Sequence, residues 1–172
     1  MGWSRAALVL VLATGCSGGG GAPAPRSTAT GPTPSGSVTA LAAPGSKDFG
    51  YFPAVVSSGP PVRLSFDRAQ FLTGDAANRA AAAHGDETPV PNDYYVVNDN
   101  RRLRTLALAG DVQVIGSQAL NGYAGDRSVE ARPRTVPQLL GFVGTAQGKE
   151  TGFNLVYGSG GVVLRVEEQY QP

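Results

Sequence analysis

The sequence is poor in the residues that build disulfide-linked or metal-held structure, with one cysteine, one histidine and one methionine among 172 residues. A single cysteine cannot form an internal disulfide framework. Zinc sites draw mainly on cysteine and histidine, so one residue of each type makes a poor donor set. The chain also lacks the His-Glu-x-x-His and Cys-x-x-Cys motifs and a phosphate-binding glycine loop. We therefore expect no metal site and no cofactor, and the sequence identifies no catalytic residue.

Long hydrophobic runs are also missing, and the apolar run Ala6–Ala13 lies in an N-terminal leader that ends at the lone cysteine, Cys16. Arg5 precedes this run. A helix over Ala6–Gly15 would span about 15 Å, half of the ~30 Å hydrocarbon core of a bilayer. The pattern predicts an export signal peptide over residues 1–15 and not a transmembrane helix.

The residues just before Cys16 resemble the lipobox of bacterial lipoproteins. Small residues, Ala13 to Gly15, precede the cysteine, although the lipobox prefers Leu at the place of Ala13. The resemblance implies that Cys16 carries a diacylglyceryl group, whose two acyl chains hold a protein firmly on a bilayer. The protein would then lie on the outer face of the bacterial cytoplasmic membrane. The alternative is an ordinary secretory signal in which the thiol of Cys16 is incidental.

A segment of low complexity separates Cys16 from the rest of the chain. Residues 17–46 are all Gly, Ala, Pro, Ser or Thr except Arg26, Val38 and Leu41. Such a composition buries too little apolar surface to fold, so residues 16–47 are expected to be a disordered linker and residues 48–172 a single globular domain. All thirteen acidic residues and eleven of the fourteen basic ones fall in this domain, whose net charge is −2. This balance gives no electrostatic reason to expect binding to nucleic acid.

The hydrophobic pattern of the domain predicts mostly short strands with two helices. The helix-capping pairs are Asp67–Gln70 and Thr135–Gln138, and the helices are expected to end at Gly85 and near Gly144. The expected strands are Gly50–Val56, Val62–Phe66, Tyr94–Val97, Leu103–Leu108, Val112–Ile115, Phe153–Tyr157 and Val162–Val166, with a turn at Ala109–Gly110. Because hairpins outnumber crossovers, we expect an α+β fold. It would be a mainly antiparallel curled sheet or half-open small barrel of about seven strands with two packing helices.

The segment Pro91–Asn100, PNDYYVVNDN, followed by Arg102–Leu106, resembles a signature of uncharacterised secreted proteins and lipoproteins of actinobacteria and other Gram-positive bacteria. The stretches Phe71–Ala77 and Val166–Pro172 are similar to the same group, whereas Arg101 stands where the group tends to have Pro. The resemblance implies an extracytoplasmic location and a fold, but no activity.

The same segment holds the candidate binding residues. Residues at alternate positions of a strand share a face, so Arg102 and Arg104 are expected to point the same way. An arginine beside a tyrosine ring can hold a carboxylate or phosphate group. Alternatively, these arginines are solvated charges that discourage edge pairing. The candidate residues are Tyr94, Tyr95, Asn98, Asp99, Asn100, Arg102 and Arg104.

Two further groups of polar residues have simpler explanations than a functional site. The Asn and Asp residues at 92, 93 and 98–100 offer oxygen ligands for Ca²⁺, but their crowding in adjacent positions favours turns. The only histidine, His84, falls at the expected C-terminus of the first helix, where a cation suits the helix dipole.

These features predict a β-rich, lipid-anchored, extracytoplasmic binding module and favour it over an enzyme. The expected partners are the membrane, through Cys16, and either an envelope glycopolymer or a protein. One alternative is a cell-envelope hydrolase with an unrecognised site, for example a pocket that gathers His84 with a serine and a carboxylate. Another is a structural or assembly subunit of an envelope complex, which would expose a large apolar patch.

Overall fold

The computed structural model describes residues 42–123 and 129–171 of the chain. The leader, the predicted lipidation site Cys16 and most of the predicted linker lie outside the described residues. The first strand starts at Lys47, the last residue of the predicted linker. In the described part of the chain, no helix has both the length and the hydropathy that a bilayer span requires.

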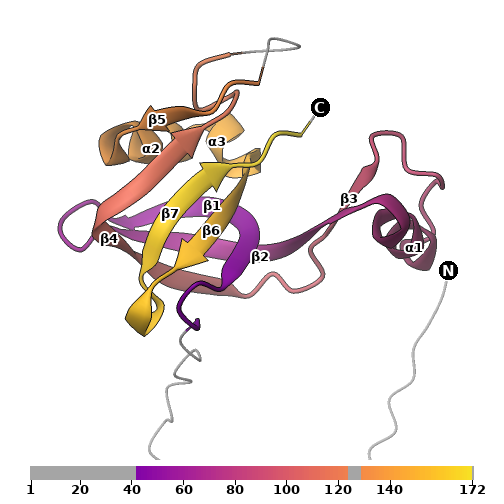
Figure 1. Ribbon diagram of the computed structural model, residues 1–172, viewed down its shortest axis with the longest axis horizontal. Coiled ribbons are helices and arrows are strands. Elements are labelled where there is room, and N and C mark those ends of the chain that lie inside the picture. The colour runs from indigo at the N-terminus through magenta and orange to yellow at the C-terminus, as the bar shows by residue number, and fades with distance from the viewer. Residues whose placement is uncertain (1–41, 124–128, 172) are drawn as a thin grey trace, which may run out of the picture. The chain divides into compact units, whose positions relative to one another are not determined.

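Five strands close into a barrel (Figure 1). They are β1 (Lys47–Ser57), β2 (Arg63–Thr73), β4 (Leu103–Gly116), β6 (Gly152–Tyr157) and β7 (Val163–Glu168). β2 pairs with β1 and β4, β6 pairs with β1 and β7, and β7 closes the barrel on β4. All of these pairings are antiparallel except β4–β7, which is parallel. The prediction of a small, mainly antiparallel barrel with packing helices is confirmed.

The order and directions of the five strands are those of an OB-fold barrel. Numbered along the chain, the barrel strands run in the order 1-2-3-5-4, and the parallel pair joins the third and the fifth. Two helices, α2 (Val136–Val143) and α3 (Ala146–Glu150), connect the third strand to the fourth by way of the short β5 (Arg132–Arg134). This topology defines the architecture alone, because one fold serves many unrelated functions.

Apolar side chains that face inward fill the barrel. Phe52, Phe66 and Phe153 are fully buried, and the ring centroid of Phe52 lies 5.6 Å from that of Phe66 and 5.1 Å from that of Phe153. Gly50 belongs to the same inward row, since a Cβ atom there would meet the Phe66 ring at 2.8 Å. Alternation along the strands therefore decides which residues reach the interior.

Helix α2 packs onto one end of this core. Its buried residues Leu139 and Val143 belong to the barrel cluster, and its first residue, Val136, lines a cleft with Pro60 and Pro61 of the β1–β2 connection. α2 therefore covers the end of the barrel that carries this connection. The capping box predicted for Thr135 and Gln138 is present at the start of the helix.

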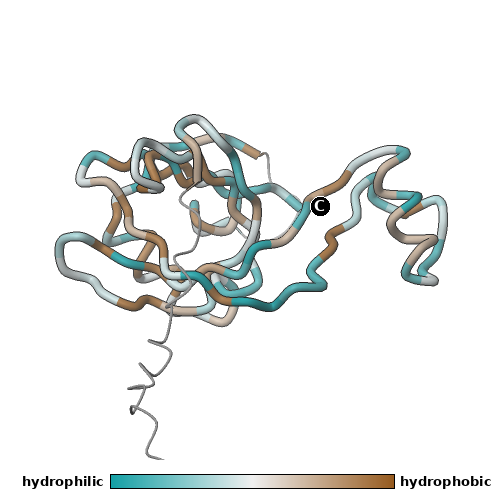
Figure 2. Tube along the Cα trace, turned by 90° about the horizontal axis from the view of Figure 1, so that it is seen from below, coloured by the Kyte–Doolittle hydropathy of each residue, from teal (hydrophilic) through white to brown (hydrophobic). Residues whose placement is uncertain are grey.

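The end of β2, helix α1 (Gly74–His84) and strand β3 (Tyr94–Val97) form an arm beside the barrel. Figures 1 and 2, which differ by a 90° turn, both show this arm apart from the barrel. The arm has its own small apolar cluster, in which Ala77, Ala81 and Val90 are buried and Leu72 and Tyr95 pack against them.

The predicted start of the first helix at Asp67 is wrong, because β2 continues to Thr73 and α1 begins at Gly74. One edge of β2 pairs with β4 up to Asp67 and then with β3 from Gln70 onward. These ladder hydrogen bonds to distant strands outweigh the local capping pattern. The predicted end of the helix is confirmed, since Gly85 adopts the left-handed conformation with φ 78°.

The predicted turn at Ala109–Gly110 is also wrong, because β4 runs without a break from Leu103 to Gly116. Its pairing with β7 is irregular between Leu108 and Gln113, so this stretch is a local irregularity within one long strand. Two short elements, β5 and α3, were not predicted. The expected total of seven strands is still observed in the described residues. Two predicted strands form the single strand β4, and the unpredicted β5 restores the count.

Candidate functional site

The inward-facing rows of three barrel strands end in charged residues. Asp48 on β1, Arg68 on β2 and Arg104 on β4 each stand an even number of positions from a buried residue of their own strand. Those buried residues are Phe52, Phe66 and Leu108. A layer of charged side chains therefore lies over the apolar core, at the opposite end of β1 from the connection that α2 covers.

Asp48, Arg68 and Tyr157 form a hydrogen-bonded group in this layer. Arg68 Nε donates to Asp48 Oδ1 at 2.7 Å, and Arg68 Nη2 donates to the same oxygen. Tyr157 Oη donates to Asp48 Oδ2 at 3.1 Å. The Asp48 side chain is only 11% exposed, so its charge depends on Arg68 for compensation. Burial and the neighbouring Asp48 carboxylate raise the pKa of Tyr157, which keeps its hydroxyl protonated as a donor.

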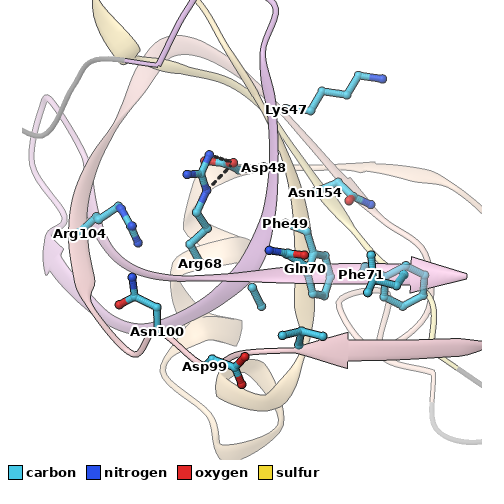
Figure 3. A pocket seen from close by; sticks show the side chains of 13 residues that line it. Lys47, Asp48, Phe49, Arg68, Gln70, Phe71, Asp99, Asn100, Arg104 and Asn154 are labelled. Atoms are coloured by element: carbon cyan, nitrogen blue, oxygen red, sulfur yellow. Dashed lines mark hydrogen bonds and ion pairs between the residues drawn. The ribbon is translucent and has the colours of Figure 1, made fainter. Parts of the chain in front are cut away.

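An open cleft of about 700 Å³ lies over this charged layer and is called here the barrel-mouth cleft (Figure 3). Its polar lining consists of Lys47, Asp48, Arg68, Gln70, Asp99, Asn100, Arg104 and Asn154. In Figure 3 the Arg104 side chain reaches toward the Asp48–Arg68 pair from the far side of the cleft, and Lys47 points away from that pair. Phe49, Phe71, Leu72 and Val97 contribute apolar surface.

Lys47 and Arg104 are the cations of this cleft that form no ion pair with a described residue, and of the two Arg104 is the one that reaches toward the Asp48–Arg68 pair. Arg104 Nη1 donates to the carbonyl oxygen of Arg102 at 3.1 Å. Its side chain is half-buried, and its charge is close enough to Tyr157 to influence the pKa of that residue. Among the described residues, no acceptor is paired with the other guanidinium N–H groups of Arg104. Because a guanidinium grips carboxylate and phosphate with paired donors, the barrel-mouth cleft suits an anionic group.

Six of the seven predicted binding residues are divided among three clefts. Asp99, Asn100 and Arg104 line the barrel-mouth cleft. Tyr94 and Tyr95 line a separate cleft of about 490 Å³ in the arm. Tyr94 stacks on Phe71 with centroids 5.0 Å apart, and the Tyr95 hydroxyl donates to Asp86. The structure therefore does not bring the tyrosines and Arg104 together in one cleft.

The two remaining predicted residues lie outside these two clefts. Asn98 lines a third cleft, together with Asp67. Arg102 lines none of the three clefts, although it is two residues from Arg104. Arg102 and Arg104 therefore do not line the same cleft.

His84 forms a surface pair with Asp99. Its Nδ1 lies 2.8 Å from the Ala80 carbonyl oxygen, and its Nε2 lies 3.2 Å from the Asp99 carboxylate. The bond to Ala80 and then the bond to Asp99 raise the pKa of His84. Among the described residues, no serine hydroxyl is hydrogen-bonded to His84, so this pair lacks the nucleophile of a hydrolytic triad.

The described ranges also contain no group of three His, Cys, Asp or Glu side chains placed to hold a metal. Within the Asn- and Asp-rich segment, Asp93 has φ 55°, a left-handed conformation that suits a turn.

Sequence reasoning missed Asp48 and Arg68, the central ion pair of the barrel-mouth cleft. Arg68 was missed because Asp67 was assigned to a helix cap. The available signal was the alternation that made Leu64 and Phe66 face inward, because one more step along the same strand places Arg68 on that face.

Comparison of the chain with protein-family models, with curated proteins and with solved structures gives no match. The resemblance to secreted proteins and lipoproteins therefore remains a prediction, and the function has to be argued from the clefts themselves.

Proposed function

We propose that the protein is a lipid-anchored, extracytoplasmic binding module whose barrel-mouth cleft holds an anionic group of an envelope component. The observation that carries this proposal is the position of Arg104. It is a half-buried cation in an open cleft, and it has no carboxylate partner among the described residues. A cation held in this way is ready to bind an anion without first breaking an ion pair.

The surroundings of Arg104 favour an anionic sugar polymer over a bare ion. Gln70, Asn100 and Asn154 line the same cleft and can hydrogen-bond hydroxyl groups. Apolar surface from Phe49 and Phe71 lies beside them. By analogy at the level of fold alone, OB-fold barrels bind oligosaccharides and oligonucleotides, and the domain net charge of −2 argues against the second class.

The alternative functions gain less support from the structure. A hydrolase that used His84 as its base would need a nucleophile beside it, and none is hydrogen-bonded to His84 in the described residues. A structural subunit would present a broad apolar patch, but the exposed large apolar residues of the described part are few and, apart from two neighbours on β1, come from different segments. They are Val55, Val56, Leu103, Val129 and Leu164.

The proposal is tested by thermal unfolding of the purified full-length chain with two anionic oligomers, an oligogalacturonate and an oligomer of glycerol phosphate. A ligand that binds only the folded state stabilises it by about 2.7 kcal/mol at 100 times its Kd, which corresponds to a shift of several degrees. Arg104→Ala is expected to abolish the shift, because it removes the unpaired cation that reaches toward the Asp48–Arg68 pair.

The matched control is Arg102→Ala, which removes the same charge two residues away and outside the three clefts. This variant should keep the ligand-induced shift. Unfolding of both variants without ligand shows whether either change damages the fold. The proposal is wrong if neither oligomer shifts the melting temperature of the wild-type chain, or if the two variants lose the shift equally.

A further inference from the structure

A third cleft, of about 710 Å³, lies on the outer face of the barrel and is called here the outer cleft. Tyr51 and Asp67 reach it from β1 and β2, where the two residues are direct cross-strand partners. Asn98 and Arg101 reach it from the segment that follows β3, and Lys149 reaches it from α3. Three separate parts of the fold thus converge on one space that the barrel-mouth cleft does not include.

The outer cleft contains two buried acceptor oxygens that lack donors. Asn98 Nδ2 donates to Asp67 Oδ2 at 3.0 Å, which fixes the two side chains against each other. Asp67 Oδ1 and Asn98 Oδ1 are buried and have no hydrogen-bond partner among the described residues. Buried acceptors of this kind are rare in folded proteins because leaving them unpaired is unfavourable. One of the two belongs to a carboxylate, so a positively charged donor suits the pair best.

The same cleft contains two cations that lack anions. Arg101 and Lys149 line it, and neither forms an ion pair with any described residue. Glu150 is the second acidic residue in the lining, so the charged side chains of the cleft balance. The outer cleft therefore presents acceptors that need a donor together with cations that need an anion.

A metal ion would not satisfy these unpaired groups. Ca²⁺ takes six to eight oxygen ligands, and Mg²⁺ requires a near-ideal octahedron. The cleft offers two carboxylates, Asp67 and Glu150, and one amide, and no group of three metal-ligating side chains occurs in the part of the chain that the structure describes. The two cations beside these oxygens would also repel a metal.

We infer that the outer cleft binds a zwitterionic group, whose ammonium donates to Asp67 Oδ1 and Asn98 Oδ1 while its anionic end pairs with Arg101 and Lys149. The ammonium supplies the missing donors, and the phosphate or carboxylate supplies the missing acceptors. This inference is independent of the barrel-mouth proposal, because the two clefts share no lining residue. A phospholipid headgroup and an amino acid have this same chemistry.

The test is calorimetric titration of the full-length chain with O-phosphoethanolamine, β-alanine, ethanolamine and inorganic phosphate. The first two probes are zwitterions with a phosphate and a carboxylate end, respectively, and the last two carry charge of one sign only. At least one zwitterion should bind about tenfold or more tightly than either of the last two probes, since both ends contribute. Preference for O-phosphoethanolamine indicates a headgroup source, and preference for β-alanine indicates an amino-acid source.

Two variants separate the two ends of the ligand. Asp67→Asn keeps the shape and an oxygen for Asn98 but removes the charge, so it should weaken zwitterion binding about tenfold or more. Arg101→Ala should reduce the affinity for the zwitterion, because it removes one of the two cations that pair with the anionic end of the ligand. The control is Asp111→Asn, an exposed carboxylate outside the clefts described above, which should bind as the wild type does.

The inference is overturned if neither zwitterion binds, or if ethanolamine binds as tightly as O-phosphoethanolamine. It is also overturned if a folded Asp67→Asn chain keeps wild-type affinity. Thermal unfolding of each variant establishes that it is folded, and Arg101→Ala, which changes an exposed residue, provides a second readout if Asp67→Asn does not fold.

Discussion

At the scale of single residues, Glu168 shows how a charged side chain can be buried without a cation. Only 5% of Glu168 is exposed, and it forms no ion pair with any described residue. Its carboxylate accepts backbone N–H groups from four consecutive residues, Ser117 to Leu120, at 2.6–3.2 Å. The last strand of the barrel thereby holds the turn that follows β4.

We predict that Glu168→Gln lowers the free energy of unfolding by about 2 kcal/mol, because the amide turns a donor toward N–H groups that need an acceptor. Denaturation of the full-length chain by urea measures the change. Glu167→Gln is the matched control, since Glu167 is a half-exposed neighbour paired with Arg165. Its effect should stay within about 0.5 kcal/mol. Equal effects of the two substitutions would contradict the role given to Glu168.

At the scale of elements, the two glycines of the α2–α3 pair are expected to respond to alanine in opposite directions. A Cβ atom on Gly148 would overlap the backbone carbonyl of Phe142, whereas a Cβ atom on Gly141 has no atom within 4 Å. Gly148→Ala should therefore destabilise the protein by at least about 2 kcal/mol through overpacking. Gly141→Ala should stabilise it by up to about 1 kcal/mol through helix propensity.

Thermal unfolding of the two alanine variants beside the wild type measures this contrast. The variants add the same methyl group at two positions seven residues apart, one in each helix, so a general effect of alanine cannot produce opposite signs. A tolerated Gly148→Ala would mean that α3 can move away from the end of α2.

The elements that the sequence predicted well are those whose signals are local. Helix α2 was predicted because Thr135 and Gln138 form its capping box directly before the apolar stretch. The end of β2 was mistaken for a helix, because what holds Gln70 in a strand is Val97 of β3, a partner distant in the sequence. The continuity of β4 likewise depends on β7.

The residues of the candidate site were likewise predicted only where the signal in the sequence is local. Arg104 could be found within an arginine-rich segment, and it does line the barrel-mouth cleft. Its neighbour Arg68 was missed because the strand was predicted to end at Phe66, although the alternation of Leu64 and Phe66 extends to it. Asp67 and Asn98, 31 residues apart, could not be paired from the sequence at all. Local patterns predict elements, whereas a site depends on which elements the fold brings together.

At the scale of the whole described domain, the barrel and the arm are expected to differ in stability. The arm cluster has three buried residues, whereas the barrel cluster has thirteen, including all of the largest fully buried side chains. Because local opening is opposed by buried apolar contacts, amides of β3 should exchange with solvent at a lower opening free energy than amides of β6. Native-state hydrogen exchange of the full-length chain measures both.

Val90→Ala sharpens this comparison, since Val90 packs only in the arm cluster. The substitution should speed exchange in β3 and leave β6 unchanged. Equal acceleration in both strands would show that the arm and the barrel open as one unit.

The pairing of the first barrel strand with β6 has a consequence for the time course of folding. Asp48 and Tyr157, which are hydrogen-bonded in the charged layer under the barrel-mouth cleft, are 109 residues apart in the chain. During synthesis β1, β2 and β4 emerge long before β6 and β7, so a growing chain can form a three-stranded meander but cannot close the barrel. Contacts of such long range place folding on the slower, millisecond-to-second side of small domains. The barrel-mouth cleft is thus complete only after the last strands have been made.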